Sequence, residues 1–180
     1  MVFSGNRRAV RTALLALSLT VVAVRGARAD EVIDRVLAVV AGDLIMQSDV
    51  RAARELGLVT ANDSGDQDRA VLSQLIDRAL ILDEVERYAP PEPSPDAIDR
   101  AFRAVRGRFA SDDAFDAVLA RTGFDERQLR SVLRQNLRIR AYLDQRFGGE
   151  TPERGEAIIA AWVAGLRSRA TIVDLYKSER

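Results

Sequence analysis

Few residues of this 180-residue chain are of types that support catalysis or metal binding, because the sequence contains neither cysteine nor histidine. A thiolate nucleophile and an imidazole general base are therefore excluded. Zinc sites lose their two preferred ligand types, and no disulfide can form. Any catalysis would have to rely on carboxylates, lysine or hydroxyls, and we predict neither an enzyme nor a bound metal or cofactor.

Two groups of acidic residues are the remaining candidates for metal or acid–base chemistry. Asp63, Asp66 and Asp68 lie in or next to a polar segment, and Asp112 is followed directly by Asp113. A calcium loop of the EF-hand type needs a glycine at its sixth position and a glutamate at its twelfth, and this frame is missing. A glycosidase-like pair needs two acids held at a fixed separation in a cleft. Cap and loop positions account for these residues sufficiently.

A polar pair inside the core is a third candidate. Asn136 and Arg140 lie four residues apart on the apolar face of one predicted long helix, and Asp83 and Glu86 lie within the apolar arc of another. A buried arginine has to be paired, because an unpaired buried charge is very costly. We therefore expect Arg140 to pair structurally with Asp83 or Glu86. The alternative is that the edges of these helices are wetter than the pattern indicates.

Four further arginines recur along the opposite face of the same helix, at Arg127, Arg130, Arg134 and Arg138. Such a stripe attracts acidic segments or anionic lipid headgroups. A solvated face balanced by neighbouring acids is the interpretation that we favour.

The elements that position these residues begin with a predicted hairpin. Residues 32–40 are rich in β-formers, 41–43 form a tight turn, and 44–46 return as a second strand. Ser48 is the expected cap of a short helix over residues 49–56. At the other end of the chain, residues 170–176 are again rich in β-formers.

The middle of the chain is predicted to be helical, from its caps and apolar periodicity. Helices are expected at 67–88, from Ser94 to about Phe109, from Ser111 to Gly123, from Asp125 to Phe147 and after Thr151. The expected fold is therefore mainly α: a helical bundle with a small sheet. The terminal strand joins the N-terminal hairpin in that sheet and so brings the two ends of the domain together.

Residues 1–29 have the pattern of a cleavable secretory signal peptide. Arginines precede an apolar run at 13–24, which is too short to span a bilayer as an anchor, and the small-x-small motif ends at Ala29, where cleavage is expected. The adjacent Arg7 and Arg8 leave both the general secretory and the twin-arginine route open.

Residues 30–180 then form one domain of ordinary size. The leader holds five arginines and no acid, so this domain has 22 basic and 27 acidic residues and a net charge of −5. A mildly acidic domain is a poor binder of nucleic acid.

Four segments in this order resemble the N-terminal domain of the SurA-type periplasmic chaperones. They are VLAVVAGDLIMQSDV (36–50), LSQLIDRALILDEVER (72–87), the helical series ending in FDERQLRSVLRQNLRIRAYLDQRF (124–147), and AAWVAGLRSRATIVDLY (160–176). Each motif alone is mostly an apolar pattern; their order and spacing make the match specific. The resemblance implies a helical bundle like the SurA N-terminal and trigger-factor C-terminal domains, closed here by residues 157–176.

One departure from that family limits what the resemblance implies. Parvulin-type prolyl isomerase modules commonly stand between the third and fourth segments of relatives, and here only residues 148–156 stand there. The isomerase activity is therefore not expected. The chaperone core is expected: binding of unfolded outer-membrane or secreted proteins in the periplasm, without ATP.

Two other functions stay open beside the chaperone. The chain could be a structural adaptor of envelope biogenesis with one dedicated partner, or a homodimer that exchanges a strand or segment between copies. A client surface could be lined by aromatic side chains, which suit adaptable binding. At helical spacing such residues are more typical of a core, and we favour the core for each. The four candidates are Phe102, Phe109, Phe115 and Tyr142.

Overall fold

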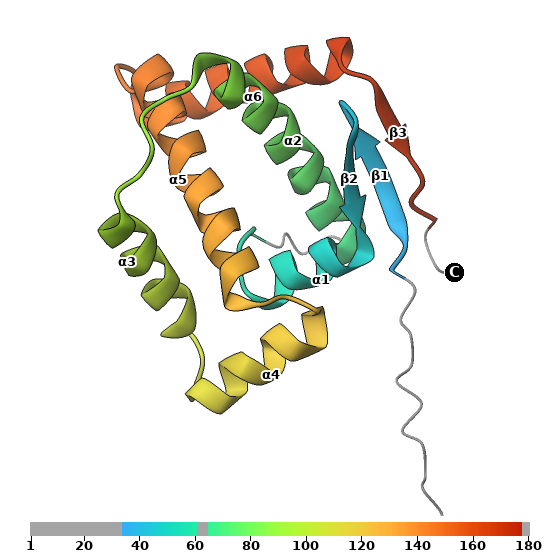
Figure 1. The fold of residues 1–180 in the computed structure, drawn as a ribbon. Helices are drawn as coiled ribbons and strands as arrows, with labels where there is room; N and C mark the ends of the chain where they lie inside the picture. The colour runs from blue at the N-terminus through green and yellow to red at the C-terminus, as the bar shows by residue number, and fades with distance from the viewer. Residues whose placement is uncertain (1–33, 61–64, 178–180) are drawn as a thin grey trace, which may run out of the picture. The chain divides into compact units, whose positions relative to one another are not determined.

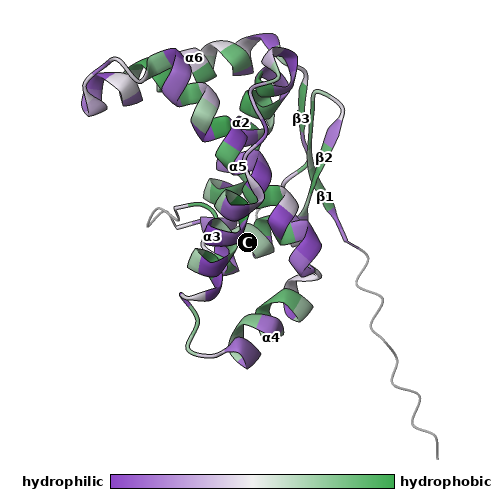
Figure 2. Cartoon of the chain, turned by 60° about the vertical axis from the view of Figure 1, so that its left-hand side comes forward, coloured by the Kyte–Doolittle hydropathy of each residue, from purple (hydrophilic) through white to green (hydrophobic). Residues whose placement is uncertain are grey.

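Six helices and one three-stranded sheet make up residues 34–60 and 65–177, the parts of the chain that the computed structural model describes (Figure 1). The expected signal peptide and Asp63 lie outside these residues. The prediction of a mainly helical fold with a small sheet is confirmed. In Figure 2 the helices alternate between hydrophobic and hydrophilic residues, as amphipathic helices do, whereas the strands are mostly hydrophobic.

The hairpin consists of β1 (Val36–Val40) and β2 (Asp43–Met46), paired antiparallel. Its two turn residues, Ala41 and Gly42, have φ values of 51° and 98°. A two-residue turn with both φ angles positive is the type I′ connection, whose twist matches that of the flanking strands.

Strand β3 (Ile172–Asp174) pairs antiparallel with the other edge of β1, so the order in the sheet is β2-β1-β3. Val39 at the centre stands opposite Leu44 on one side and Val173 on the other. The prediction that the two ends of the domain share one sheet is confirmed.

A bulge in β1 lets successive side chains enter the core. The register with β2 shifts between Val36 and Ala38, which leaves Leu37 as the extra residue. Leu37 and Ala38 are therefore both almost completely buried, with 1% and 0% of their surface exposed. The residues opposite Val39 remain on the outer face, where Leu44 is 58% and Val173 45% exposed.

Helix α1 (Gln47–Glu55) begins one residue before Ser48, so the prediction of Ser48 as its cap is wrong. The N–H of Met46 donates to the carboxylate of Asp49 at 2.8 Å. Ser48 instead lies in the first turn, and its own N–H and hydroxyl both donate to the carboxylate of Asp34. Two aspartates thus provide acceptors at this helix start.

Three of the other helices begin at the predicted caps Ser94, Ser111 and Asp125, whereas α6 begins after Thr151 without a side-chain cap. The side chains of Asp66, Ser94, Ser111 and Asp125 each accept a hydrogen bond at an N-terminus, and Gln128 completes a capping box with Asp125. The helices are α2 (Gln67–Tyr88), α3 (Pro95–Arg106), α4 (Asp112–Thr122), α5 (Glu126–Phe147) and α6 (Pro152–Arg169).

The buried apolar residues form two separate clusters. The first cluster packs the sheet on α1, α2 and α6, and the second joins α1 to α3, α4 and the first half of α5. Short helix α1 serves both, because Val50 and Ala53 belong to the first and Ala52 and Leu56 to the second. Neither cluster contains buried residues from both α2 and α5.

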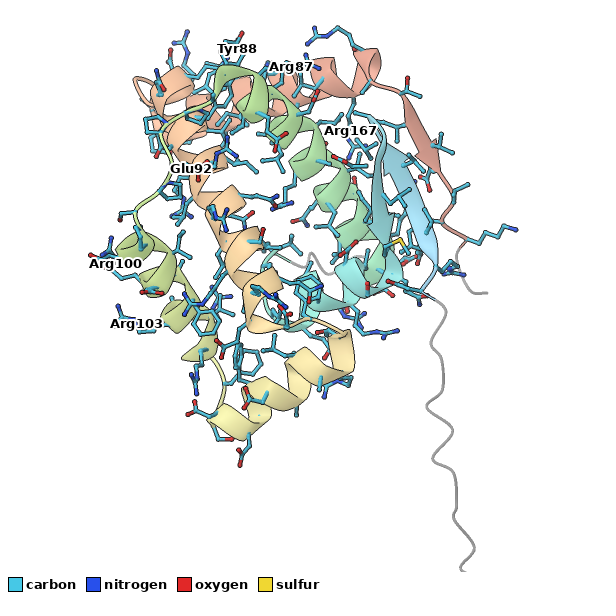
Figure 3. All side chains as sticks on the ribbon, in the orientation of Figure 1. Arg87, Tyr88, Glu92, Arg100, Arg103 and Arg167 are labelled. Carbon is cyan, nitrogen blue, oxygen red and sulfur yellow. The ribbon has the colours of Figure 1, made fainter. Side chains whose placement is uncertain are left out.

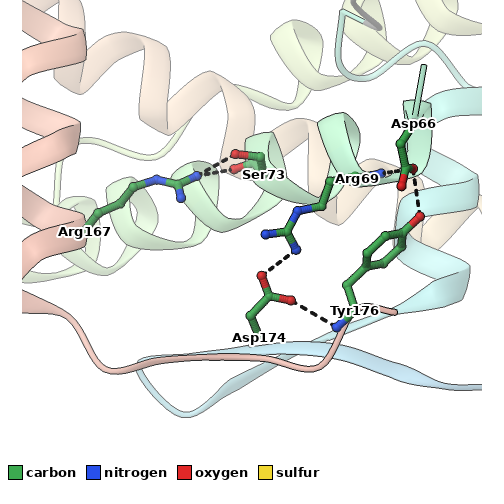
Figure 4. Close-up of polar contacts among 6 residues, drawn as sticks. All are labelled: Asp66, Arg69, Ser73, Arg167, Asp174 and Tyr176. Atoms are coloured by element: carbon green, nitrogen blue, oxygen red, sulfur yellow. Dashed lines mark hydrogen bonds and ion pairs between the residues drawn. The ribbon is translucent and has the colours of Figure 1, made fainter. Parts of the chain in front are cut away.

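Helix α6 is tied to α2 by one arginine, as Figure 4 shows in part. One guanidinium nitrogen of Arg167 donates to the carbonyl and to the hydroxyl of Ser73, at 2.8 and 2.9 Å. Another pairs with Asp77 at 2.5 Å.

The segment from β3 onward is tied to the start of α2 by two further contacts, also drawn in Figure 4. Arg69 pairs with Asp174 at 2.5 Å, and the hydroxyl of Tyr176 donates to Asp66 at 2.8 Å. Desolvation and then the hydrogen bond to Asp66 raise the pKa of Tyr176 to about 12, so its hydroxyl keeps its proton at neutral pH.

The inward and outward residues of β3 should differ in their effect on stability. Ile172 packs against the first cluster, whereas Val173 lies on the outer face. We expect Ile172→Ala to lower the free energy of unfolding by about 1–2 kcal/mol. The control Val173→Ala should stay within about 0.5 kcal/mol of the original. Urea denaturation measures both, and equal effects would contradict the observed role of β3 in closing the core.

Candidate functional site

Two adjoining hollows lie between the long helices α2 and α5. The sheet-side hollow has a volume of about 370 Å³ and is bordered by β2, α1, α2 and α5. The α6-side hollow has a volume of about 580 Å³ and is bordered by residues 58–60, α2, α5 and α6. They exist because neither buried cluster fills the space between the middle parts of α2 and α5.

The walls of both hollows are mainly aliphatic. On α2, Leu75, Ala79 and Leu82 follow helical spacing and face the sheet-side hollow. The α6-side hollow takes its apolar surface from Ile81, Ile139, Leu143 and Ile159. Such surfaces bind apolar groups without demanding one shape.

Arg78 stands where the two hollows meet. Arg78, Asn136, Leu58 and Val59 line both of them. The Nε of Arg78 donates to Oδ1 of Asn136 at 2.8 Å, and its Nη2 donates to Oε1 of Gln135 at 2.7 Å. These two bonds join α2 to α5 at a point where buried apolar packing does not.

The charge of Arg78 has no contacting carboxylate among the described residues. Both of its acceptors are neutral amides. Burial lowers the pKa of Arg78, and the attraction of Asp49 opposes that shift without forming an ion pair. Burial is also the largest cause that raises the pKa of Asp49, whose carboxylate already accepts the N–H of Met46.

The predicted pairing of Arg140 with Asp83 or Glu86 is not formed. Arg140 is exposed and lines the α6-side hollow. Asp83 pairs instead with Arg87 of its own helix at 2.6 Å, at the end of α2 where Figure 3 labels Arg87, and Glu86 is exposed. The helix edges are wetter than the pattern indicated, because the space between α2 and α5 is open.

Asn136 does take part in a polar contact across the helices, but its partner is Arg78. Arg78 was not among the residues predicted from the sequence. The available signal was the position of Arg78 inside the apolar arc of α2, between Leu75 and Leu82. Choosing its partner required knowing which turn of α5 faces that arc.

The aromatic candidates lie mostly in the interior rather than along the hollows. Phe102, Phe115 and Tyr142 are buried, and Phe109 is half-buried against the second cluster. The rings of Phe102 and Phe115 meet edge to face with centroids 5.7 Å apart. Their packing agrees with the core interpretation, and the open surface between α2 and α5 is aliphatic instead.

The arginines along the other side of α5 are largely balanced by acids, as favoured. Three of the four form ion pairs: Arg127 with Asp125, Arg130 with Asp99, and Arg138 with Glu92. The acid partners come partly from α3 and from the linker that carries Glu92, which Figure 3 shows beside α5. The face is therefore partly covered, while Arg100 and Arg103 of α3 point away from it.

The acidic residues that are described serve local contacts. Asp66 caps α2, Asp68 pairs with Arg54, and Asp112 pairs with Arg106. Within residues 34–60 and 65–177, no group of three or more acidic side chains is placed to hold a metal ion. In the same ranges, no helix has the length and apolarity required to cross a membrane.

No protein-family model matches this chain, and no curated protein matches it either. The resemblance to the SurA-type chaperones therefore stays a prediction from the residues, and the site has to be interpreted from its own geometry.

Removing Asn136, one of the two acceptors of Arg78, should destabilise the protein. We expect Asn136→Leu to lower the free energy of unfolding by about 1.5–3 kcal/mol, because a hydrogen bond to a desolvated charge is lost. The double variant Arg78→Met/Asn136→Leu should recover most of this loss.

The control for this double-mutant cycle is Arg140→Met, which removes an exposed arginine from the α6-side hollow. It should change the free energy of unfolding by no more than about 0.5 kcal/mol. Denaturant titration of Asn136→Leu, Arg78→Met, the double variant and the control, each against the original, gives the coupling energy. A coupling near zero between Arg78 and Asn136 would show that the observed bonds do not hold α2 and α5 together.

Proposed function

We propose that this protein is an ATP-independent periplasmic chaperone that binds extended, apolar segments of unfolded outer-membrane or secreted proteins between α2 and α5. The observation that carries the proposal is the pair of adjoining, aliphatic-lined hollows of about 370 and 580 Å³. Open, mainly apolar surface of this kind is typical of sites that bind chains or ligands.

The free edge of β2 supports binding of extended chain in particular. In a two-residue hairpin the residues next to the turn, Val40 and Asp43, are a hydrogen-bonded pair, so the following residue Leu44 directs its N–H and C=O away from β1. Strand β2 is at the edge of the sheet, and Leu44 and Ile45 also line the sheet-side hollow. A bound segment can therefore add main-chain hydrogen bonds while its side chains enter the hollow.

Release needs no energy source in this proposal. Each aliphatic contact contributes a small part of the affinity, and a flexible client loses conformational entropy when it is held. Affinity is consequently modest, and clients exchange as they fold. No catalytic step is part of the proposal, so prolyl isomerisation above background in a peptide assay would contradict it.

The two hollows together form a groove between α2 and α5, and this groove should be required for suppression of aggregation. We expect Leu82→Asp and Leu143→Asp, one in each hollow, to weaken the protection of unfolded clients by about tenfold, since each replaces buried apolar contact by a charge. Leu175→Asp is the matched control: Leu175 is 47% exposed, lines neither hollow and should leave protection unchanged. Light scattering with several unrelated unfolded clients measures the effect.

The range of clients separates the chaperone from the adaptor. Protection of several unrelated clients supports the chaperone. Protection of one protein alone would replace it by a dedicated adaptor of envelope biogenesis. An original protein that protects none of them would overturn the proposal.

A further inference from the structure

Arg78 is half-buried but forms no ion pair. Among the other half-buried arginines of the described residues, Arg106, Arg130, Arg138 and Arg167 each pair with a carboxylate within 4 Å, whereas Arg51 does not. Arg78 is more buried than a surface arginine and nevertheless bonds only to the amides of Gln135 and Asn136. A desolvated charge without a counter-ion is a strong determinant of what can bind beside it.

The guanidinium also has donors to spare. It carries five N–H bonds, and the two amide oxygens accept one from Nε and one from Nη2. Both N–H bonds of Nη1 and one of Nη2 have no protein acceptor in the described residues. Nη1, which has no protein acceptor, is not among the buried side-chain atoms, and Arg78 lines both hollows, so Nη1 can be reached from the groove.

The four acidic side chains that line the groove do not serve as a counter-ion for Arg78. Asp49 is held by the N–H of Met46, and Asp77 pairs with Arg167. Asp43, at the end of the hairpin, and Asp144, on α5, are exposed. None of the four forms an ion pair with Arg78.

The location of Arg78 indicates what kind of carboxylate fits. Because it lines both hollows, a segment that occupies the two of them has to pass it with chain on either side. The carboxylate then belongs to an internal side chain rather than to a chain end. The aliphatic walls on both sides favour apolar neighbours.

From these positions we infer that Arg78 makes the groove selective for client segments in which one acidic side chain is flanked by apolar residues. This inference rests on the proposed function, since it names the sequence class that the same groove prefers. The acidic side chain accepts from the free N–H bonds of Arg78, and apolar side chains on either side occupy the sheet-side and α6-side hollows. The pairing supplies selectivity, and the apolar contacts supply most of the binding.

The test compares three fluorescently labelled peptides by anisotropy on the full chain. The first is a twelve-residue segment of Leu, Val and Ser with a central Glu, the second has Gln in its place, and the third ends at that position in a free carboxylate. We expect the Glu peptide to bind about tenfold more tightly than the Gln peptide. This preference should shrink as salt is raised, because a partly exposed ion pair is screened.

Variants assign the preference to one residue. Arg78→Met should bind the Glu and Gln peptides equally while still binding the Gln peptide, and the control Arg134→Met, which removes an exposed arginine of α5 that lines neither hollow, should keep the full preference. Arg78→Lys keeps the charge without the forked donors and should keep part of it. This third variant covers the case in which Arg78→Met does not fold.

The outcomes separate the two proposals. If none of the peptides binds, the proposed function fails. If the Glu and Gln peptides bind the original protein equally, or the peptide ending in a carboxylate binds best, the groove binds clients but the inference is wrong.

Discussion

Strand β1 has to be paired on both of its edges, and much of the remaining arrangement depends on that requirement. Leu37, Ala38 and Val40 are almost completely buried, so the backbone that carries them lies inside the protein, where unpaired N–H and C=O groups are costly. The hairpin partner β2 satisfies one edge, and β3 from the far end of the chain satisfies the other. Pairing with β3 places α6 beside α2, where Arg167 binds Ser73 and Asp77.

The same closure explains why the protein has two cores and an open space between them. The first cluster is completed by the sheet, α2 and α6, and the second by the helices α3 to α5. Helix α1 and the adjoining Leu58 contribute to both. The two longest helices therefore share neither cluster. They meet through Arg78 and the two amides of α5, and also through the rings of Tyr88 and Tyr142, whose centroids lie 5.6 Å apart. Because this bridge between Arg78 and the amides lies among aliphatic side chains, the sheet-side hollow remains open on one side of it and the α6-side hollow on the other.

Function in this interpretation comes from incomplete packing rather than from a catalytic constellation. Aliphatic walls tolerate many sequences, while one arginine with three of its five N–H bonds unused gives the surface a chemical preference. The edge of β2 beside the sheet-side hollow adds backbone hydrogen bonding, which does not depend on client sequence. The wide range of clients and the preference among them thus come from different groups of the same site.

Most of the local structure could be predicted from the sequence, because caps and apolar periodicity act between residues close in the chain. Asp66, Ser94, Ser111 and Asp125 begin helices as their patterns indicate, and the β-rich ends pair as expected. Ser48 is not the cap because the helix begins at Gln47. The N–H of Met46 donates to Asp49, and the N–H and hydroxyl of Ser48 donate to Asp34.

Which helix faces meet depends instead on contacts between distant parts of the chain. Two residues four apart on α5, Asn136 and Arg140, looked equivalent in the sequence, yet one reaches Arg78 and the other is exposed. Their difference depends on the angle and register between α2 and α5, which follow from closing the sheet through residues more than a hundred positions apart. No local pattern contains that information, and the groove exists because of it.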